Sequence, residues 1–129
     1  MSASSPLVSV ITPVHNGAAF LRECIESVVR QTYEAWEYVI VDNASTDESR
    51  AIAEEYAARD RRIRVLSTPA LLPAVDSQNF ALEQVPQASI YCKVVHADDW
   101  LFPECLARMV EAAEAHPTIG IVSAYRLEG

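Results

Sequence analysis

Short apolar runs alternate with helix-like segments along this chain, and this alternation limits the fold more than any other feature. Runs rich in Val and Ile predict strands at residues 7–12, 37–41, 63–66, 90–95 and 119–124. Apolar residues at helical spacing predict helices at about 18–31, 45–60, 74–84 and 103–116. Strands that alternate with helices form parallel sheets through right-handed crossovers. We therefore expect an α/β fold: a Rossmann-like, open, mostly parallel sheet with helices on both faces.

Local signals set the ends and the faces of these elements. Ser45 followed by Glu48 is a capping-box pattern that predicts the start of the second helix. Pro103 is expected at the first position of the last helix, where its missing N–H costs nothing. Lys93 lies inside an apolar strand and is expected to snorkel or to lie near a sheet edge. The first helix is expected to bury one stripe, formed by Phe20, Leu21, Cys24, Ile25, Val28 and Val29.

Composition excludes two common phosphate-binding devices. The chain has 129 residues and three glycines, Gly17, Gly120 and Gly129, so it holds neither a G-x-G-x-x-G fingerprint nor a G-x-x-x-x-G-K-S/T loop. Its 18 acidic residues outnumber 10 basic ones, and the net charge of −8 disfavours binding to nucleic acid. A phosphorylated ligand would therefore need another device to hold its charge.

The length suits one domain, with residues 1–6 as a flexible N-terminus and residues 7–129 as the folded unit. Cys24, Cys92 and Cys105 show no C-x-x-C spacing, which fits a reducing compartment. The N-terminus lacks the pattern of a signal peptide, and no apolar run is long enough to span a membrane. We therefore expect a cytoplasmic protein.

Three polar segments follow predicted strands: Pro13–Asn16, Asp42–Asp47 and His96–Trp100. In an open parallel sheet they meet at one rim, where ligands bind beyond the carboxyl ends of the strands. Asp98 and Asp99 would repel each other there unless a cation such as Mg²⁺ or Mn²⁺ bound to them. The pair predicts a metal bridge to a phosphate, and the alternative is a helix cap or a solvated turn.

The other polar residues of these segments allow competing interpretations. Asp42 is expected either to accept hydrogen bonds from a base or ribose or to form an Asx turn. His96 is either a ligand for a metal or phosphate or a histidine bonded within its loop. Asp47 is expected to serve the helix dipole, and His116 to be structural at a helix end. Trp100 is expected to pack under its loop, with stacking on a sugar as the alternative.

Four stretches, in this order and spacing, resemble the signatures of the family 2 glycosyltransferases, which have the GT-A fold. They are Val8–Asn16, Ser27–Tyr33, Val39–Asp47 and Ala97–Leu101, and the resemblance runs from Val8 to about Val122. Members of this family are inverting enzymes that use nucleotide-diphosphate sugars. The resemblance implies that this chain is the nucleotide-binding half of such an enzyme.

The resemblance also implies roles for single residues. Nucleotide binding is expected at Pro13, His15, Asn16, Asp42, Asn43, Gln78, Asn79 and Asp98, and metal binding at Asp98 and Asp99, with His96 as a further candidate ligand. Gln78 stands where the family usually has Arg, Asn43 where it often has Asp, and His96 where many members have the first Asp of the metal motif. These departures leave the nucleotide preference open.

The expected reaction moves a sugar from a nucleotide-diphosphate donor, with UDP-sugars favoured, to a hydroxyl of a glycan or lipid-linked glycan, with Mn²⁺ or Mg²⁺ as cofactor. In this family the acceptor-binding part and the general base follow the metal motif, so they are expected beyond residue 129. The full-length protein is then expected in the cytoplasm or at the inner face of the membrane.

Three alternatives differ from a sugar transferase. The first is a degenerate member of the family that binds a nucleotide or a partner protein without catalysis. A nucleotidyltransferase usually has a Gly-rich or basic loop after the first strand, which residues 13–17 do not form. A receiver domain has its acidic pair after the first strand, whereas here the pair follows the fourth. The oligomeric state is not predicted.

Overall fold

The computed structural model describes residues 6–86 and 89–115 and shows the expected α/β architecture. Within this part of the chain, four strands form one sheet in the order β3-β2-β1-β4, and neighbouring strands are parallel. The strands are β1 (Val8–Val14), β2 (Trp36–Asp42), β3 (Ile63–Ser67) and β4 (Tyr91–Val94). The helices are α1 (Ala18–Val29), α2 (Ser49–Arg59), α3 (Ala74–Glu83) and α4 (Cys105–Ala115). The predicted strand at 119–124 and His116 lie outside the described residues.

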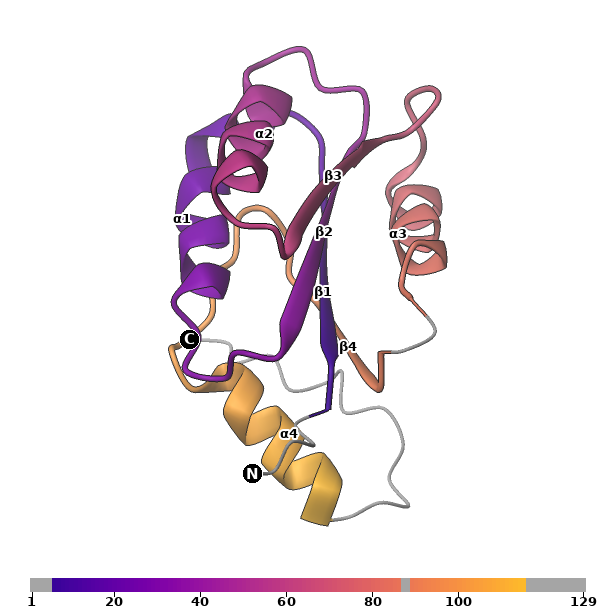
Figure 1. The fold of residues 1–129 in the computed structure, drawn as a ribbon. Helices are drawn as coiled ribbons and strands as arrows, with labels where there is room; N and C mark the ends of the chain where they lie inside the picture. The colour runs from indigo at the N-terminus through magenta and orange to yellow at the C-terminus, as the bar shows by residue number, and fades with distance from the viewer. Residues whose placement is uncertain (1–5, 87–88, 116–129) are drawn as a thin grey trace.

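Helices cover both faces of the sheet, as expected: α1 and α2 lie on one face and α3 on the other (Figure 1). Side chains alternate between these faces along each strand. Val10 and Ile40 enter the core beneath α1 and α2, whereas Ile11 and Val39 pack with Ala81 of α3 in a second, smaller core. Packing on both faces explains why almost every residue of β1 and β2 is buried, rather than every second one.

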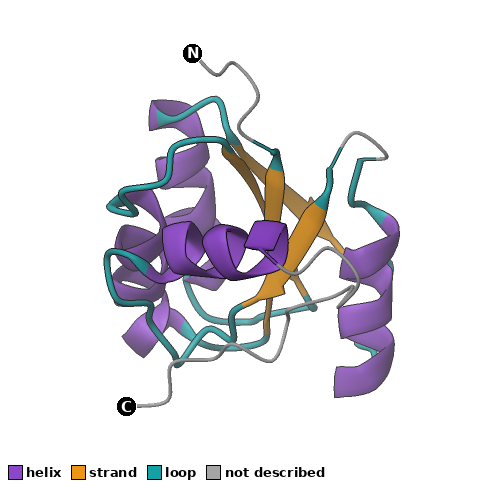
Figure 2. Ribbon diagram, turned by 90° about the horizontal axis from the view of Figure 1, so that it is seen from below, coloured by secondary structure: helices purple, strands orange, loops and turns teal. Residues whose placement is uncertain are grey.

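The helix α4 lies at the end of the sheet where the strands begin, opposite the rim where they end (Figures 1 and 2). The chain reaches α4 by running back along α1. Ser27 Oγ accepts the Leu101 N–H at 3.0 Å, and Gln31 Nε2 donates to the Phe102 carbonyl at 2.7 Å. Gln31 Oε1 also accepts the Leu106 N–H at 2.9 Å, which satisfies one of the open N–H groups at the start of α4.

The predicted capping box does not form. The helix α2 begins at Ser49 rather than near Ser45, and no side-chain hydrogen bond forms at its N-cap residue, Glu48. Ser45 Oγ instead accepts the Asn16 N–H at 2.8 Å. Ser45 therefore joins the loops after β1 and β2, because a backbone N–H outside its own helix competes for its hydroxyl.

Two further expectations about single residues are corrected, and a third holds in one of its two alternatives. Pro103 lies in the turn before α4, so the helix begins at Cys105. Phe20 is 55% exposed, which makes the buried stripe of α1 narrower than expected. Lys93 is 1% exposed and does not snorkel, because it pairs in register with Val10 on a buried face. The alternative expectation holds, because Lys93 lies on β4, one of the two edge strands of the described sheet.

Candidate functional site

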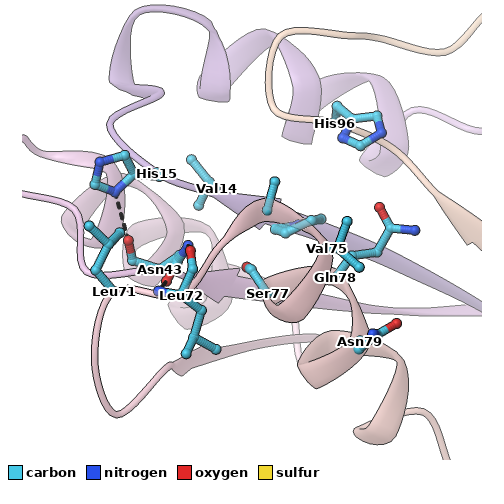
Figure 3. Close-up of a pocket in the computed structure, with 12 residues that line it drawn as sticks. Val14, His15, Asn43, Leu71, Leu72, Val75, Ser77, Gln78, Asn79 and His96 are labelled. Carbon is cyan, nitrogen blue, oxygen red and sulfur yellow. Dashed lines mark hydrogen bonds between the residues drawn. The ribbon is translucent and has the colours of Figure 1, made fainter.

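A cleft of about 360 Å³ lies at the rim where β1, β2 and β4 end, and α3 forms its outer wall (Figure 3). The predicted residues that line it are Pro13, His15, Asn43, Gln78, Asn79 and His96. They come from the segments after three different strands and from α3, which confirms that the polar segments meet at one rim. Asn16, Asp42 and Asp98 were also predicted, and they lie outside the lining of this cleft.

Side chains at the start of α2 cap the start of α1 beside the cleft. Ser49 Oγ accepts the Gly17 N–H at 2.9 Å, and Asp47 Oδ2 accepts the Ala18 N–H at 3.1 Å. Asp47 Oδ1 also accepts the Ser49 N–H at 2.9 Å, and hydrogen bonds from Ser49 lower the pKa of the Asp47 carboxyl. Asp47 precedes α2 and serves the dipoles of both helices. It also fills the start of α1, a position where many folds bind phosphate.

His15 and Asn16 connect the loop after β1 to the loop after β2. Asn16 Oδ1 accepts the Thr46 N–H at 2.7 Å, so Asn16 Nδ2 is the group 3.3 Å from His15 Nε2. His15 Nδ1 is 2.7 Å from the Asn43 carbonyl oxygen and must carry a proton, because a carbonyl can only accept. Both ring nitrogens of His15 are therefore engaged in holding the loops together.

The amide of Asn43 clips the loop after β3 to the end of β2. Asn43 is 5% exposed. Its Nδ2 donates to the Leu72 carbonyl at 2.8 Å, and its Oδ1 accepts the Leu72 N–H at 2.9 Å. The Thr68 hydroxyl donates to the same Oδ1 at 3.0 Å. An aspartate could not donate to the Leu72 carbonyl, so this clip depends on asparagine at this position.

Asp42 lies behind the cleft instead of lining it. The side chain is 4% exposed, and its Oδ1 is enclosed with no hydrogen-bond partner. Alternation along β2 places Asp42 on the face of Ile40, whereas Asn43 follows on the cleft side. A carboxylate oxygen without a partner is costly inside a protein, so a hydrogen-bond donor that reached it would be stabilising.

Residues 71–77 form a wall of the cleft that the sequence analysis missed. Leu71 and Val75 are 61% and 70% exposed although both are large and apolar. Leu72 lines the cleft between them in sequence. Ser77, in contrast, is 2% exposed, and its Oγ is enclosed without a hydrogen-bond partner. The sequence held one signal for this wall: the loop between Pro69 and Pro73 is apolar, whereas surface loops are ordinarily polar.

Asp98 and Asp99 lie in the turn that follows β4. The Asp99 N–H donates to the His96 carbonyl at 2.9 Å and closes this turn. Cys24 Sγ lies 3.5 Å from the same carbonyl, and burial raises the pKa of the Cys24 thiol to about 11. Gly17 permits the close packing here, because a Cβ on it would lie 3.2 Å from that of Ala97. Asp98 is exposed and Asp99 is half-buried.

These carboxylates fit a hard dication only if the ligand shares in holding it. Ions of the Mg²⁺ type take one or two carboxylates together with waters and phosphate oxygens. Across residues 6–86 and 89–115, no cluster of three or more His, Cys, Asp or Glu side chains could hold a metal ion by itself. Asp98 and Asp99 would therefore need further ligands from a bound molecule to hold such an ion.

Trp100 does not pack under its loop. It is 47% exposed and meets Phe102 edge to face, with ring centroids 4.9 Å apart. A smaller hollow of about 220 Å³ beside Trp100 is lined by Glu23 of α1 and by Arg30, which directly follows that helix. This hollow lies on the return path along α1 and shares no lining residue with the cleft.

Comparisons with known proteins agree with this architecture. The family model described as glycosyl transferase family 2 matches residues 9–128. The O-antigen biosynthesis protein RfbC of Myxococcus xanthus is 36% identical over 124 residues, which are 91% of this chain and 9% of RfbC. The chain spans between 9% and 43% of the length of the curated relatives that it matches.

Two solved structures with bound nucleotides have the same fold. Residues 1–349 of Staphylococcus aureus TarS in complex with UDP give a TM-score of 0.77 at 26% identity, covering 85% of this chain and 32% of that one. The mannosyltransferase PcManGT from Pyrobaculum calidifontis, in complex with GDP-Man and Mn²⁺, gives a TM-score of 0.80 at 26% identity, covering 92% and 35%. Separately, the described residues include no helix long and apolar enough to cross a bilayer.

Proposed function

This chain belongs to glycosyl transferase family 2, and from that membership we propose that it binds a nucleotide-diphosphate sugar in the cleft at the rim of its sheet. The observation that carries the proposal is the convergence of the segments after β1, β2 and β4 on a single cleft. β2 and β4 flank β1 on opposite sides, so the strand order reverses next to β1. Ligands of open α/β sheets bind at such a switch point.

In this proposal the base lies at the end of the cleft near Leu71 and Leu72, and the diphosphate lies toward His96 (Figure 3). The first end has the apolar side chains of Leu71, which is exposed, and Leu72, and a planar base would cover them. The other end adjoins the turn of Asp98 and Asp99. The polarity of the two ends supports this orientation of the donor.

The diphosphate needs a positive partner, and the start of α1 does not supply one. Ser49 and Asp47 already accept the Gly17 and Ala18 N–H groups there. Asp98 and Asp99 would instead hold Mn²⁺ or Mg²⁺, with the more exposed Asp98 as the principal protein ligand. When bound, such a cation neutralises the charge that develops on the departing diphosphate. The Mn²⁺ in the PcManGT complex supports a divalent cation.

We propose that the complete enzyme is an inverting transferase to which this chain contributes the donor-binding part. An acceptor hydroxyl attacks the anomeric carbon in line, the bond to the diphosphate breaks, and a general base takes the hydroxyl proton. We expect that base beyond residue 129, as we expect the acceptor site. An acceptor of the glycan or lipid-linked glycan class is supported by the similarity to the O-antigen biosynthesis protein.

Thermal shift with nucleotides tests the proposal. UDP and GDP are added with and without Mn²⁺ to the wild-type chain, to Asp98→Asn and to Glu111→Gln, which removes an exposed carboxylate on α4. The wild type and Glu111→Gln should gain about 5 °C in Tm with at least one nucleotide and Mn²⁺ together. Asp98→Asn should lose most of the part that depends on Mn²⁺. If no nucleotide shifts the wild type with or without Mn²⁺, the proposal is wrong.

A further inference from the structure

Ser77 is a buried hydroxyl for which the protein provides no hydrogen-bond partner. It lies in the first turn of α3, is 2% exposed and has an enclosed Oγ without a partner. Its own N–H donates to the Pro73 carbonyl at 2.9 Å, the acceptor that a helical serine hydroxyl often shares. Unpartnered buried polar groups are few in native proteins, and each one calls for an explanation.

The surroundings of Ser77 suggest a ligand as the missing partner. Ser77 lines the cleft between the apolar side chains of Leu72 and Val75, which form a slot beside it, and among the described lining residues it carries the only hydroxyl (Figure 3). Such a slot fits a planar heterocycle whose edge carries a hydrogen-bonding atom. Ala81, one turn after Ser77 on the same face of α3, packs against the sheet. The position of Ser77 over the strand ends is thus fixed by the core.

The helix end favours an acceptor over a donor at this place. The helix α3 has no side-chain hydrogen bond at its N-cap residue, Pro73. Its first N–H groups therefore keep the partial positive charge of a helix N-terminus. The one carboxylate in this turn, Asp76, is exposed to solvent, which screens it. A keto oxygen is attracted to this end of α3, whereas an amino group is not.

We propose that the Ser77 hydroxyl selects the nucleobase by donating a hydrogen bond to a keto oxygen, so that uracil is preferred to cytosine. This inference rests on the proposed function, since it names the base that the same cleft takes. UDP and CDP are a matched pair for it: they share ribose and diphosphate, and their bases differ at position 4, keto in uracil and amino in cytosine, and at the adjacent N3, which carries a hydrogen only in uracil. A hydroxyl that contacted the ribose would not discriminate between them.

The test compares UDP and CDP affinities, by calorimetric titration with Mn²⁺, for the wild type, Ser77→Ala and Ser67→Ala. Ser67 is an exposed serine outside the cleft and serves as the matched control. We expect the wild type and Ser67→Ala to bind UDP about tenfold more tightly than CDP. Ser77→Ala should lose most of this preference through weaker UDP binding.

The thermal stability of the ligand-free chain is a second measurement, and it distinguishes ligand binding by Ser77 from a purely structural role. Ser77→Ala removes an unpartnered hydroxyl and improves helix propensity, so the Tm of the ligand-free chain should not fall. A clear fall in Tm would show that the hydroxyl has a partner within the protein and would overturn the inference.

The outcomes separate this inference from the function on which it rests. If the wild type binds UDP and CDP equally, or Ser77→Ala keeps the wild-type preference, Ser77 does not select the base, although the cleft still binds nucleotides. If the wild type binds neither UDP, CDP nor GDP, the proposed function fails as well.

Discussion

The N-termini of α1 and α3 lie at the same rim, but side chains cap the N–H groups of only the first. The start of α1 is filled by the protein itself, because Ser49 and Asp47 accept its first two N–H groups. The start of α3 has no side-chain cap, and the hydroxyl in its first turn, Ser77, is without a partner. Of these two helix ends, only that of α3 lines the cleft, through Ala74, Val75 and Ser77.

This difference separates the chain from a usual phosphate-binding sheet, as its three glycines and its net charge of −8 also do. The helix that follows the first strand is the usual phosphate site of a nucleotide-binding sheet. Here that helix is used to join the loops after β1 and β2, with a carboxylate in the place of the phosphate. The uncapped helix end is that of α3, on the opposite wall of the cleft. In our proposal it faces the base.

The largest effect should come from Asn43→Ala, which releases the loop that leads into α3. The change removes the acceptor of the Leu72 N–H and the donor to the Leu72 carbonyl, and it leaves the Thr68 hydroxyl with the Ala70 carbonyl as its acceptor. We expect the free energy of unfolding in urea to fall by about 2–4 kcal/mol. Asn79→Ala, which removes an exposed asparagine from the same cleft, should change it by less than about 0.5 kcal/mol. Equal losses in the two variants would show that the clip adds nothing.

A smaller loss should follow Ser49→Ala, which opens the filled helix end. The Gly17 N–H loses its acceptor, and we expect the free energy of unfolding to fall by about 1–2 kcal/mol. The affinity for UDP should stay the same, because Ser49 is outside the cleft. Ser49→Ala should therefore lower stability and leave the affinity for UDP unchanged, whereas Ser77→Ala should lower the affinity for UDP and leave stability unchanged. A tighter affinity for inorganic phosphate in Ser49→Ala would contradict the assignment of α1 as a structural end.

The smallest effect is the pH dependence that Asp47 contributes. Its carboxyl has a lowered pKa in the folded chain, so its contribution is complete above the ordinary Asp pKa of about 3.9 and is lost as the pH falls through the folded value. Asp47→Asn should lower Tm at pH 6, and the difference from wild type should shrink as the pH approaches 3. A difference that is constant between pH 6 and pH 3 would mean that the charge of Asp47 does not stabilise the junction.

The sheet and its rim could be predicted from the sequence because burial leaves a direct mark on it. The β1 and β2 segments are apolar on both faces, and the polar residues begin where the strands end. Parallel strands bring those ends together, so His15, Asn43 and His96 could be assigned to one site before their contacts were known.

The hydrogen-bond partners at the rim could not be predicted in the same way. Ser45 and Glu48 match a capping box, yet Ser45 bonds to Asn16, which is 29 residues away in sequence. Asn43 resembles a substituted ligand, whereas its amide holds Leu72. Ser77 gave no signal because its burial depends on a loop that carries no periodicity. Partners that are distant in the sequence decide the role of each of these side chains.

The clip formed by Asn43 also has a consequence for the thermodynamics of recognition. Because both polar groups of Leu72 are already bonded to Asn43, this part of the wall is ordered before a ligand arrives. A ligand then loses its own freedom on binding but does not have to immobilise Leu72 or the backbone around it. We expect association to proceed as docking into a formed slot, without the entropic penalty and the slow step of closing a loop.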